Sequence, residues 1–239
     1  MKNLLQYTCA ANAGLVLILS LLPHTVSAQM IAAPGPQAKE SSPAFSGTYA
    51  SSTTDYKLDN HLPDIDRKML GGDGSFAITP AADLFVQAAY ILDDEFSSAN
   101  TADGTGFMIG FGSRMEIYRQ DNVTVTGYGL INSFSEQFRG QGKYDDLKVS
   151  GSIFEFRFGG TASTAINPNI SPYAGLELTP YSKGKFKFST PVEALSFNIR
   201  KDSILALQLG AVLRLGNIVL RPAMSILGEQ SFLISVMSH

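Results

Sequence analysis

Seven charged side chains stand among apolar neighbours in stretches where polar and apolar residues alternate. They are four arginines and three glutamates: Arg114, Glu116, Glu155, Arg157, Glu177, Arg214 and Arg221. Because side chains of a strand alternate between its two faces, these residues share faces opposite rows of apolar side chains. Charges that are taken out of water need opposite charges beside them. We therefore expect one ionic network, which either fills the lumen of a closed sheet or lines a narrow polar pore.

A second group combines one histidine with nearby carboxylates. His61, Asp64 and Asp66 share a polar segment, and Asp93 and Asp94 end an alternating stretch. A histidine within reach of a carboxylate could activate water for hydrolysis. Polar segments also carry aspartates for solubility and turn formation, however, and the spacing matches no tight metal motif. We expect neither a catalytic residue nor a metal site in this group.

Three lysines form a third group. Lys183, Lys185 and Lys187 alternate with Phe186 and Phe188 at the spacing of a strand. A row of cations could contact the phosphates of lipopolysaccharide. The alternative is a solvated face at the base of a loop.

Long strands are needed to position these groups. In residues 106–118, apolar side chains occupy the odd positions from Phe107 to Ile117, with only Ser113 breaking the row, whereas Arg114 and Glu116 occupy even positions. A four-residue turn then leads to a second strand of similar length. Ordinary strands average five or six residues. Strands of about ten, joined by tight turns, are what a bilayer requires of a β-protein.

The same alternation predicts ten strands. The expected ranges are 45–55, 74–78, 83–93, 106–118, 123–134, a strand around 154–158, 170–179, 205–215, 218–226 and 231–238. Eight strands is the alternative if the first strand or the last hairpin is misread.

The connections between these strands alternate between long and short. Long polar connections are expected at 56–72, 94–105, 135–146 and 183–202. Short ones are expected at 79–82, 119–122, 166–169 and 216–217. The connection at 228–230 breaks the pattern, because it is short although it lies at the end where the other connections are long. Outer-membrane barrels show this asymmetry, with short periplasmic turns and longer extracellular loops.

Composition excludes several classes of protein. Charged residues make up 16% of the chain and the formal net charge is −3. The chain therefore lacks the excess of basic residues that would indicate a nucleic-acid partner. A glycine-rich stretch at 104–112 is not followed by Lys-Ser or Lys-Thr, which excludes a nucleotide-binding loop. We expect no cofactor.

Residues 1–28 have the features of a secretory signal peptide. Lys2 supplies a positive charge, residues 15–22 an apolar core, and residues 26–28 (Val-Ser-Ala) a cleavage site. The apolar core is too short to span a bilayer as a helix. Cys9 is the only cysteine and is removed with the signal, so the mature chain can form neither disulfides nor thiolate metal sites.

The mature chain then divides into two parts. Residues 29–43 are rich in Pro, Ala and Ser, and we interpret them as a flexible periplasmic lead-in. Residues 44–239 form the predicted barrel. Its fold class is all-β, a closed antiparallel up-and-down transmembrane β-barrel, because a sheet in hydrocarbon must satisfy every backbone amide by closing on itself. A soluble sandwich or ligand-binding barrel would turn the same apolar rows inward.

Residues 170–178 (ISPYAGLEL) resemble the Pro-Tyr-x-Gly segment of small outer-membrane β-barrels of the OmpA-type superfamily. The resemblance covers residues 44–239 as a pattern of strands and turns. It implies integral insertion in the outer membrane, contact with outer-membrane lipids and lipopolysaccharide, and assembly by periplasmic chaperones and the barrel-assembly machinery. Such chains usually end in an aromatic residue, whereas this one ends in Val-Met-Ser-His and its nearest aromatic is Phe232.

From these observations we expect a monomeric barrel with a structural and surface role and no enzymatic activity. Its lumen would be filled by the Arg/Glu network, and its extracellular loops would be available for binding. The alternatives are a narrow pore for small solutes or ions and, second, a rim enzyme, either a protease or a lipid A-modifying enzyme.

Overall fold

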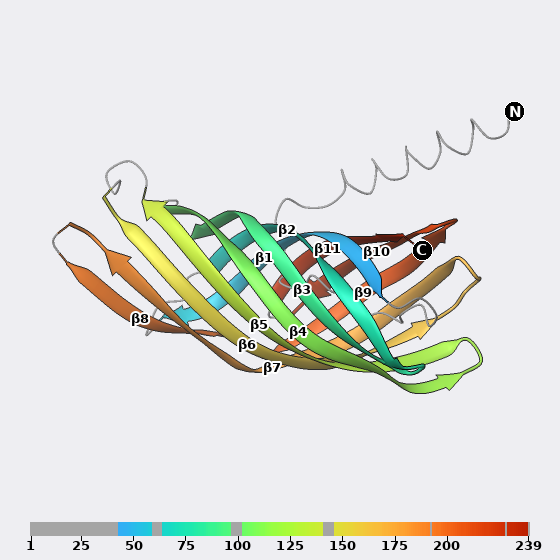
Figure 1. Cartoon of the computed structure of the whole chain (residues 1–239). Coiled ribbons are helices and arrows are strands. Elements are labelled where there is room, and N and C mark those ends of the chain that lie inside the picture. The colour runs from blue at the N-terminus through green and yellow to red at the C-terminus, as the bar shows by residue number, and fades with distance from the viewer. Residues whose placement is uncertain are drawn as a thin grey trace, which may run out of the picture.

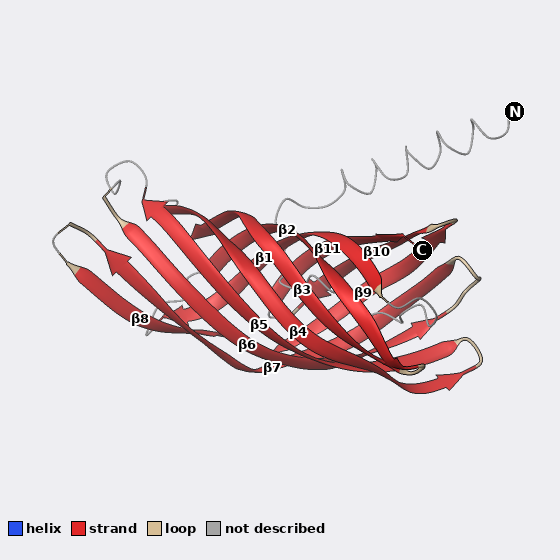
Figure 2. Ribbon diagram, viewed as in Figure 1, coloured by secondary structure: helices blue, strands red, loops and turns tan. Residues whose placement is uncertain are grey.

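A computed structural model describes residues 43–58, 64–96, 102–140, 146–191, 193–227 and 229–238. These residues form eleven β-strands. The strands are coloured red in Figure 2. The strands are β1 (Ala44–Leu58), β2 (Asp64–Thr79), β3 (Ala82–Phe96), β4 (Ala102–Gln120), β5 (Val123–Gly140), β6 (Lys148–Thr164), β7 (Ile170–Ser189), β8 (Ala194–Lys201), β9 (Leu205–Leu215), β10 (Ile218–Ile226) and β11 (Glu229–Ser238). No helix in the described part is long and apolar enough to cross a membrane. The predicted signal peptide, Cys9 and nearly all of the lead-in lie outside the described residues.

The strands close into a barrel in which every neighbouring pair is antiparallel (Figure 1). β1 pairs with β11 from Ser46↔Met237 to Thr54↔Glu229, which closes a ring of ten strands that omits β8. Both described chain ends lie at the end of the barrel that carries the short turns. The predicted fold class, a closed antiparallel barrel of about ten strands, is confirmed.

β8 is an additional strand that changes the ring at the opposite end of the barrel. The first half of β7 pairs with β9, whereas its second half pairs with β8, starting at Gly184↔Ile199. β1 likewise pairs with β8 beyond Thr54, starting at Tyr56↔Lys201. Within the described strands the wall therefore narrows from ten strands to the eight strands β1–β8. In Figure 1 the β7–β8 hairpin extends furthest to the left.

Most of the predicted long loops contain strand. β2 already begins at Asp64, and β5 continues to Gly140. The predicted loop 183–202 contains the second half of β7 and all of β8. These segments are polar because the wall continues beyond its apolar band into a region where its outer face meets water.

The outward face carries an apolar band. On β6 the side chains of Phe154, Phe156 and Phe158 point outward and are 38–44% exposed. Comparable exposed rows run along β3 and β4 at Val86, Tyr90, Leu92, Phe107, Ile109, Phe111, Met115 and Ile117. β9, β10 and β11 have 11, 9 and 10 residues, close to the nine to eleven that a tilted strand needs to cross hydrocarbon.

Beyond this band the polarity of the wall reverses. On β6 the outward residues become Ser150 and Ser152, whereas Val149 and Ile153 point inward and are buried. We call this extension of β5–β8 the collar; it comprises residues 133–140, 148–153, 182–189 and 194–201. Its interior belongs to an apolar cluster of Ala50, Tyr56, Ile65, Met69, Ala89, Ile91, Met108, Phe134, Phe138, Val149, Ile153, Phe186, Ile199 and Leu233. The collar thus has an apolar inner face and a polar outer face, as in a water-soluble barrel, whereas the part with the apolar band has the apolar outer face of a membrane barrel.

Candidate functional site

Arg157 lies at the centre of a buried ionic group in the lumen. Its Nε donates to Oε2 of Glu155 at 2.9 Å, and its Nη1 donates to Oε1 of Glu177 at 3.1 Å. β6 supplies Arg157 and Glu155, and β7 supplies Glu177. All three side chains are at most 2% exposed. Two carboxylates thus compensate the positive charge of the arginine in a site that is nearly inaccessible to water.

Tyr56 extends this group across the lumen to the opposite wall. Its hydroxyl donates to Oε1 of Glu155 at 3.4 Å and accepts from Nη1 of Arg67 at 3.2 Å. Nε of Arg67 in turn donates to Oε1 of Glu136 at 2.7 Å. A chain of six side chains therefore runs from β7 through β6, β1 and β2 to β5. We call it the lumen network; its members are Glu177, Arg157, Glu155, Tyr56, Arg67 and Glu136.

Neutral side chains hold the carboxylates of the lumen network in place. The Tyr128 hydroxyl donates to Oε2 of Glu177 at 2.9 Å, and Nε2 of Gln208 donates to the same oxygen at 3.2 Å. Ser182 Oγ donates to Oε1 of Glu155 at 3.3 Å. Glu177 and Glu155 thus each accept hydrogen bonds from more than one strand, which fixes the orientation of both carboxylates.

Arg67 is also held by aromatic rings. Its guanidinium carbon lies 5.4 Å from the ring centroid of Tyr56 and 5.3 Å from that of Phe134. A guanidinium over aromatic faces gains cation–π attraction, which is largest where water is excluded. The Arg67–Glu136 pair therefore lies where the lumen network meets the apolar cluster of the collar.

A second polar layer lies nearer the short turns. Nε of Arg114 donates to Oδ1 of Asp83 at 3.0 Å, and its guanidinium covers the ring of Phe85 at 4.5 Å. Arg221 on β10 is 2% exposed, and its Nη2 lies 3.8 Å from the sulfur of Met237.

The structure distributes the seven predicted lumen residues over several levels. Three of them, Glu155, Arg157 and Glu177, lie together in the lumen network, and Arg114 and Arg221 belong to the second layer. Glu116 pairs instead with Arg119 beside the short turn that follows β4. Arg214 is half-buried on β9, and its backbone N–H donates to the carbonyl of Asn169 at 2.8 Å.

Sequence reasoning missed half of the lumen network. Tyr56, Arg67 and Glu136 fall in segments that were predicted to be loops. A signal was nevertheless present, because Phe134, Glu136 and Phe138 alternate with Ser135 and other polar residues at strand spacing. The alternation continues through the point where polarity reverses, but polar residues then occupy the outward face.

The three predicted lysines all lie on the outer face of the collar. Lys183, Lys185 and Lys187 occupy alternate positions on β7, point away from the lumen and are exposed. Phe186, which lies between two of them, points inward and is buried.

The predicted histidine–carboxylate group is only partly described. His61 lies outside the described residues, as do the side chains of Asp64 and Asp94. Asp66 accepts a hydrogen bond from Thr53, and Asp93 forms an ion pair with Lys68. No group of three or more metal-ligating side chains occurs within the ranges that the structure describes.

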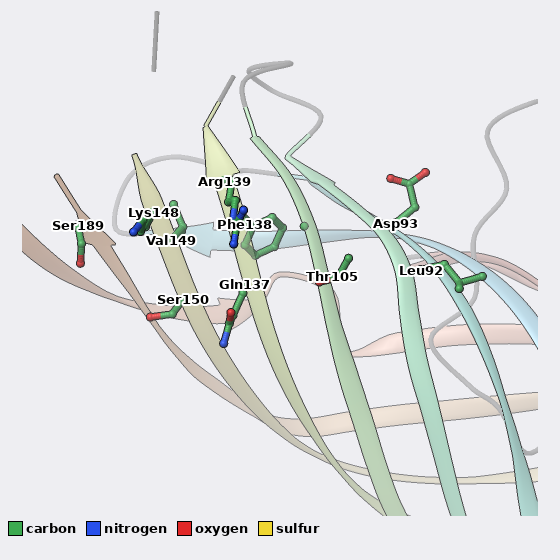
Figure 3. A pocket seen from close by; sticks show the side chains of 11 residues that line it. Leu92, Asp93, Thr105, Gln137, Phe138, Arg139, Lys148, Val149, Ser150 and Ser189 are labelled. Atoms are coloured by element: carbon green, nitrogen blue, oxygen red, sulfur yellow. The ribbon is translucent and has the colours of Figure 1, made fainter. Parts of the chain in front are cut away.

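A hollow of about 790 Å³ opens at the collar end of the barrel. Figure 3 shows Arg139 and Lys148 on neighbouring strand ends beside it. Phe138 and Val149 also line it. The hollow is therefore lined by two cations, the carboxylate of Asp93, and both polar and apolar side chains.

No family model matches the sequence, and no curated protein matches it. Solved structures do match. The chain is similar to the outer membrane protease OmpT of Escherichia coli, with 9% identity and a TM-score of 0.51, covering 86% of this chain and 97% of OmpT. It is also similar to the outer membrane protein OprG of Pseudomonas aeruginosa, with 9% identity, a TM-score of 0.43 and coverage of 82% and 95%. At such identities the likeness to OmpT concerns the fold alone, which is that of an outer-membrane transmembrane β-barrel.

Proposed function

We propose that the protein is an integral outer-membrane barrel with a structural and surface role, and that its lumen is closed to solutes. The lumen network carries this proposal, because it crosses the lumen from β7 to β5 with fully buried charges. The apolar cluster inside the collar supports it, since side chains nearly fill the interior of an eight-stranded ring. Membership of the OmpA-type superfamily is part of the same proposal and rests on the segment at 170–178.

The proposed role requires no catalysis. OmpT is named a protease, but in this chain Asp66 and Asp93 are already engaged by Thr53 and Lys68. The extended collar is instead suited to present a surface outside the cell, and its outer face is polar.

A narrow pore is the second candidate, and one observation favours it. Five buried hydroxyl side chains on β1, β10 and β11 have no hydrogen-bond partner within the described residues. They are Thr48, Ser52, Thr54, Ser225 and Ser235. Small hydroxyl groups along one side of the lumen could hydrogen-bond a file of water.

Planar-bilayer recording of the refolded protein separates the two candidates. The closed barrel predicts no stable conductance steps for the wild-type chain. Sizeable, stable steps that change on Arg157→Ala would establish the pore and contradict the closed lumen. Heat-modifiable migration on gels should first confirm that each preparation is folded.

A further inference from the structure

We propose that the outer face of β7 in the collar binds the phosphate groups of an anionic glycolipid of the outer leaflet, of the lipid A type. The site is the lysine row, Lys183, Lys185 and Lys187. The inference rests on the proposed outer-membrane placement and adds to it a ligand and the residues that bind it.

The strands beside β7 supply polar neighbours for the row. Lys185 pairs in register with Ser152 on β6 and with Asn198 on β8. Lys187 pairs in the same way with Ser150 and Ser196. All of these side chains are exposed on the outer face. Lys185 and Lys187 are therefore flanked on both sides by side chains with hydroxyl or amide groups, which can donate further hydrogen bonds to phosphate oxygens, whereas Lys183 is flanked on β6 by Phe154.

The charges of the lysine row are not compensated by the protein. None of the three lysines has an acidic partner within the described ranges, whereas three other exposed cations do. These are Lys57 with Asp202, Lys68 with Asp93, and Arg119 with Glu116. Neighbouring like charges on one face of a sheet repel each other, and a bound polyanion removes that repulsion.

Two further cations extend the positive surface. Lys148 on β6 is exposed one strand away, near the hollow at the collar end. Arg200 follows Ile199, which pairs with Gly184, and so it lies beside Lys183 on the outer face. The positive surface thus spans three strands, wide enough for a headgroup that carries more than one phosphate.

The position of the row indicates a lipid rather than a free anion. Tyr181 precedes the row on β7 and stacks edge-on with Phe154, with ring centroids 6.1 Å apart. Both rings are outward and exposed, at the edge of the apolar band. Aromatic side chains mark the level of the headgroups in membrane proteins. A phosphate attached to acyl chains in that band would therefore meet the lysine row directly.

Binding of diphosphoryl lipid A to the refolded full chain in an uncharged detergent tests the proposal, with native mass spectrometry as the readout. Lys183→Ser/Lys185→Ser/Lys187→Ser should weaken binding on the order of a hundredfold, at about 1 kcal/mol per cation near a phosphate. The charge-matched control Lys57→Ser/Lys68→Ser/Arg119→Ser should bind like the wild type, because its cations are already paired. Lipid A without phosphates should bind poorly to all three proteins.

Two results would overturn the site. One is equal affinity for lipid A in the two triple variants, and the other is binding of inorganic pyrophosphate as tight as that of lipid A, which would indicate a free anion. Heat-modifiable migration of each variant is measured in parallel. Its loss in the wild type would contradict the proposed barrel, whereas its retention together with equal lipid A affinities would contradict only the lysine row.

Discussion

Arg67 on β2 and Glu136 on β5 form an ion pair across the lumen, with Nε of the arginine 2.7 Å from Oε1 of the glutamate. Neither side chain is exposed to solvent. The two residues are 69 positions apart in sequence, and both lie in segments whose polarity suggests loops. Their pairing joins two distant strands at the level where the lumen changes from polar to apolar.

Breaking this pair should be costly for the fold. Arg67→Ala leaves the Glu136 carboxylate buried without its main partner, and we expect the free energy of unfolding to fall by about 3–5 kcal/mol. Denaturant titration of the refolded protein in vesicles, with the folded fraction measured by gel migration, gives this value.

A double variant separates the ion pair from the packing. Arg67→Met/Glu136→Leu removes both charges and should recover most of the lost stability, because apolar replacements of similar volume suit the surrounding cluster. Lys68→Ala, which breaks an exposed pair with Asp93, should change the stability by less than about 1 kcal/mol. The single variants Arg67→Met and Glu136→Leu complete the cycle. A loss of stability in the double variant that equals the sum of the losses in these two single variants would show that the pair has no mutual coupling.

Gly110 on β4 leaves space for a hydrogen bond between amide side chains of the two neighbouring strands, β3 and β5. Nε2 of Gln87 donates to Oδ1 of Asn132 at 2.7 Å, and a Cβ on Gly110 would overlap that oxygen and lie 2.6 Å from the nitrogen. Gly110→Ala should therefore displace both amides and lower the free energy of unfolding by about 1–3 kcal/mol. Gly129→Ala is the control, since a Cβ there meets nothing within 4 Å. Equal stability of the two variants would mean that the hydrogen bond between Gln87 and Asn132 does not depend on the space at Gly110.

The apolar band predicts where a charge is tolerated on the outer face. Phe156→Arg places a cation in the middle of the outward row on β6 and should cost about 2–4 kcal/mol in vesicles. Ser152→Arg, on the same face of the same strand but in the collar, should cost about 0–1 kcal/mol. Unfolding titrations in the same lipid compare the two. Similar costs at both positions would mean that the polarity reversal on β6 does not coincide with the membrane boundary.

The sequence predicted the banded part of the barrel well, for a physical reason. Inside the membrane one face must be apolar and the other can be polar, so rows such as Phe107 to Ile117 alternate clearly. The short turns between β2 and β3, β4 and β5, β6 and β7, and β9 and β10 were expected at these places for the same reason: each connects two clear rows.

The collar and half of the lumen network were not predicted, because outside lipid the polar face turns outward. β8 illustrates the difficulty: its sequence, ALSFNIRK, contains Phe197 and Ile199 on the inner face, but its outer face is polar and its length is only eight residues. Partners across the lumen are a separate problem. Tyr56 reaches Glu155 only because β8 replaces β9–β11 at that level, and strand alternation alone does not encode such a change of ring size.

Fluorescence quenching by lipids with brominated acyl chains shows which side chains of the barrel face the lipid. The chain contains no tryptophan, so a single introduced tryptophan gives the whole tryptophan signal. Phe111 points outward and is 51% exposed, whereas Phe85 points into the lumen and is 1% exposed; Phe85 pairs in register with Gly112, so the two rings lie at similar depth. Single variants Phe111→Trp and Phe85→Trp are refolded into vesicles that contain the brominated lipid. A barrel whose apolar rows face the lipid should show strong quenching at position 111 and little at position 85. Strong quenching at 85 with little at 111 would place the apolar rows inside the barrel and contradict insertion in a membrane.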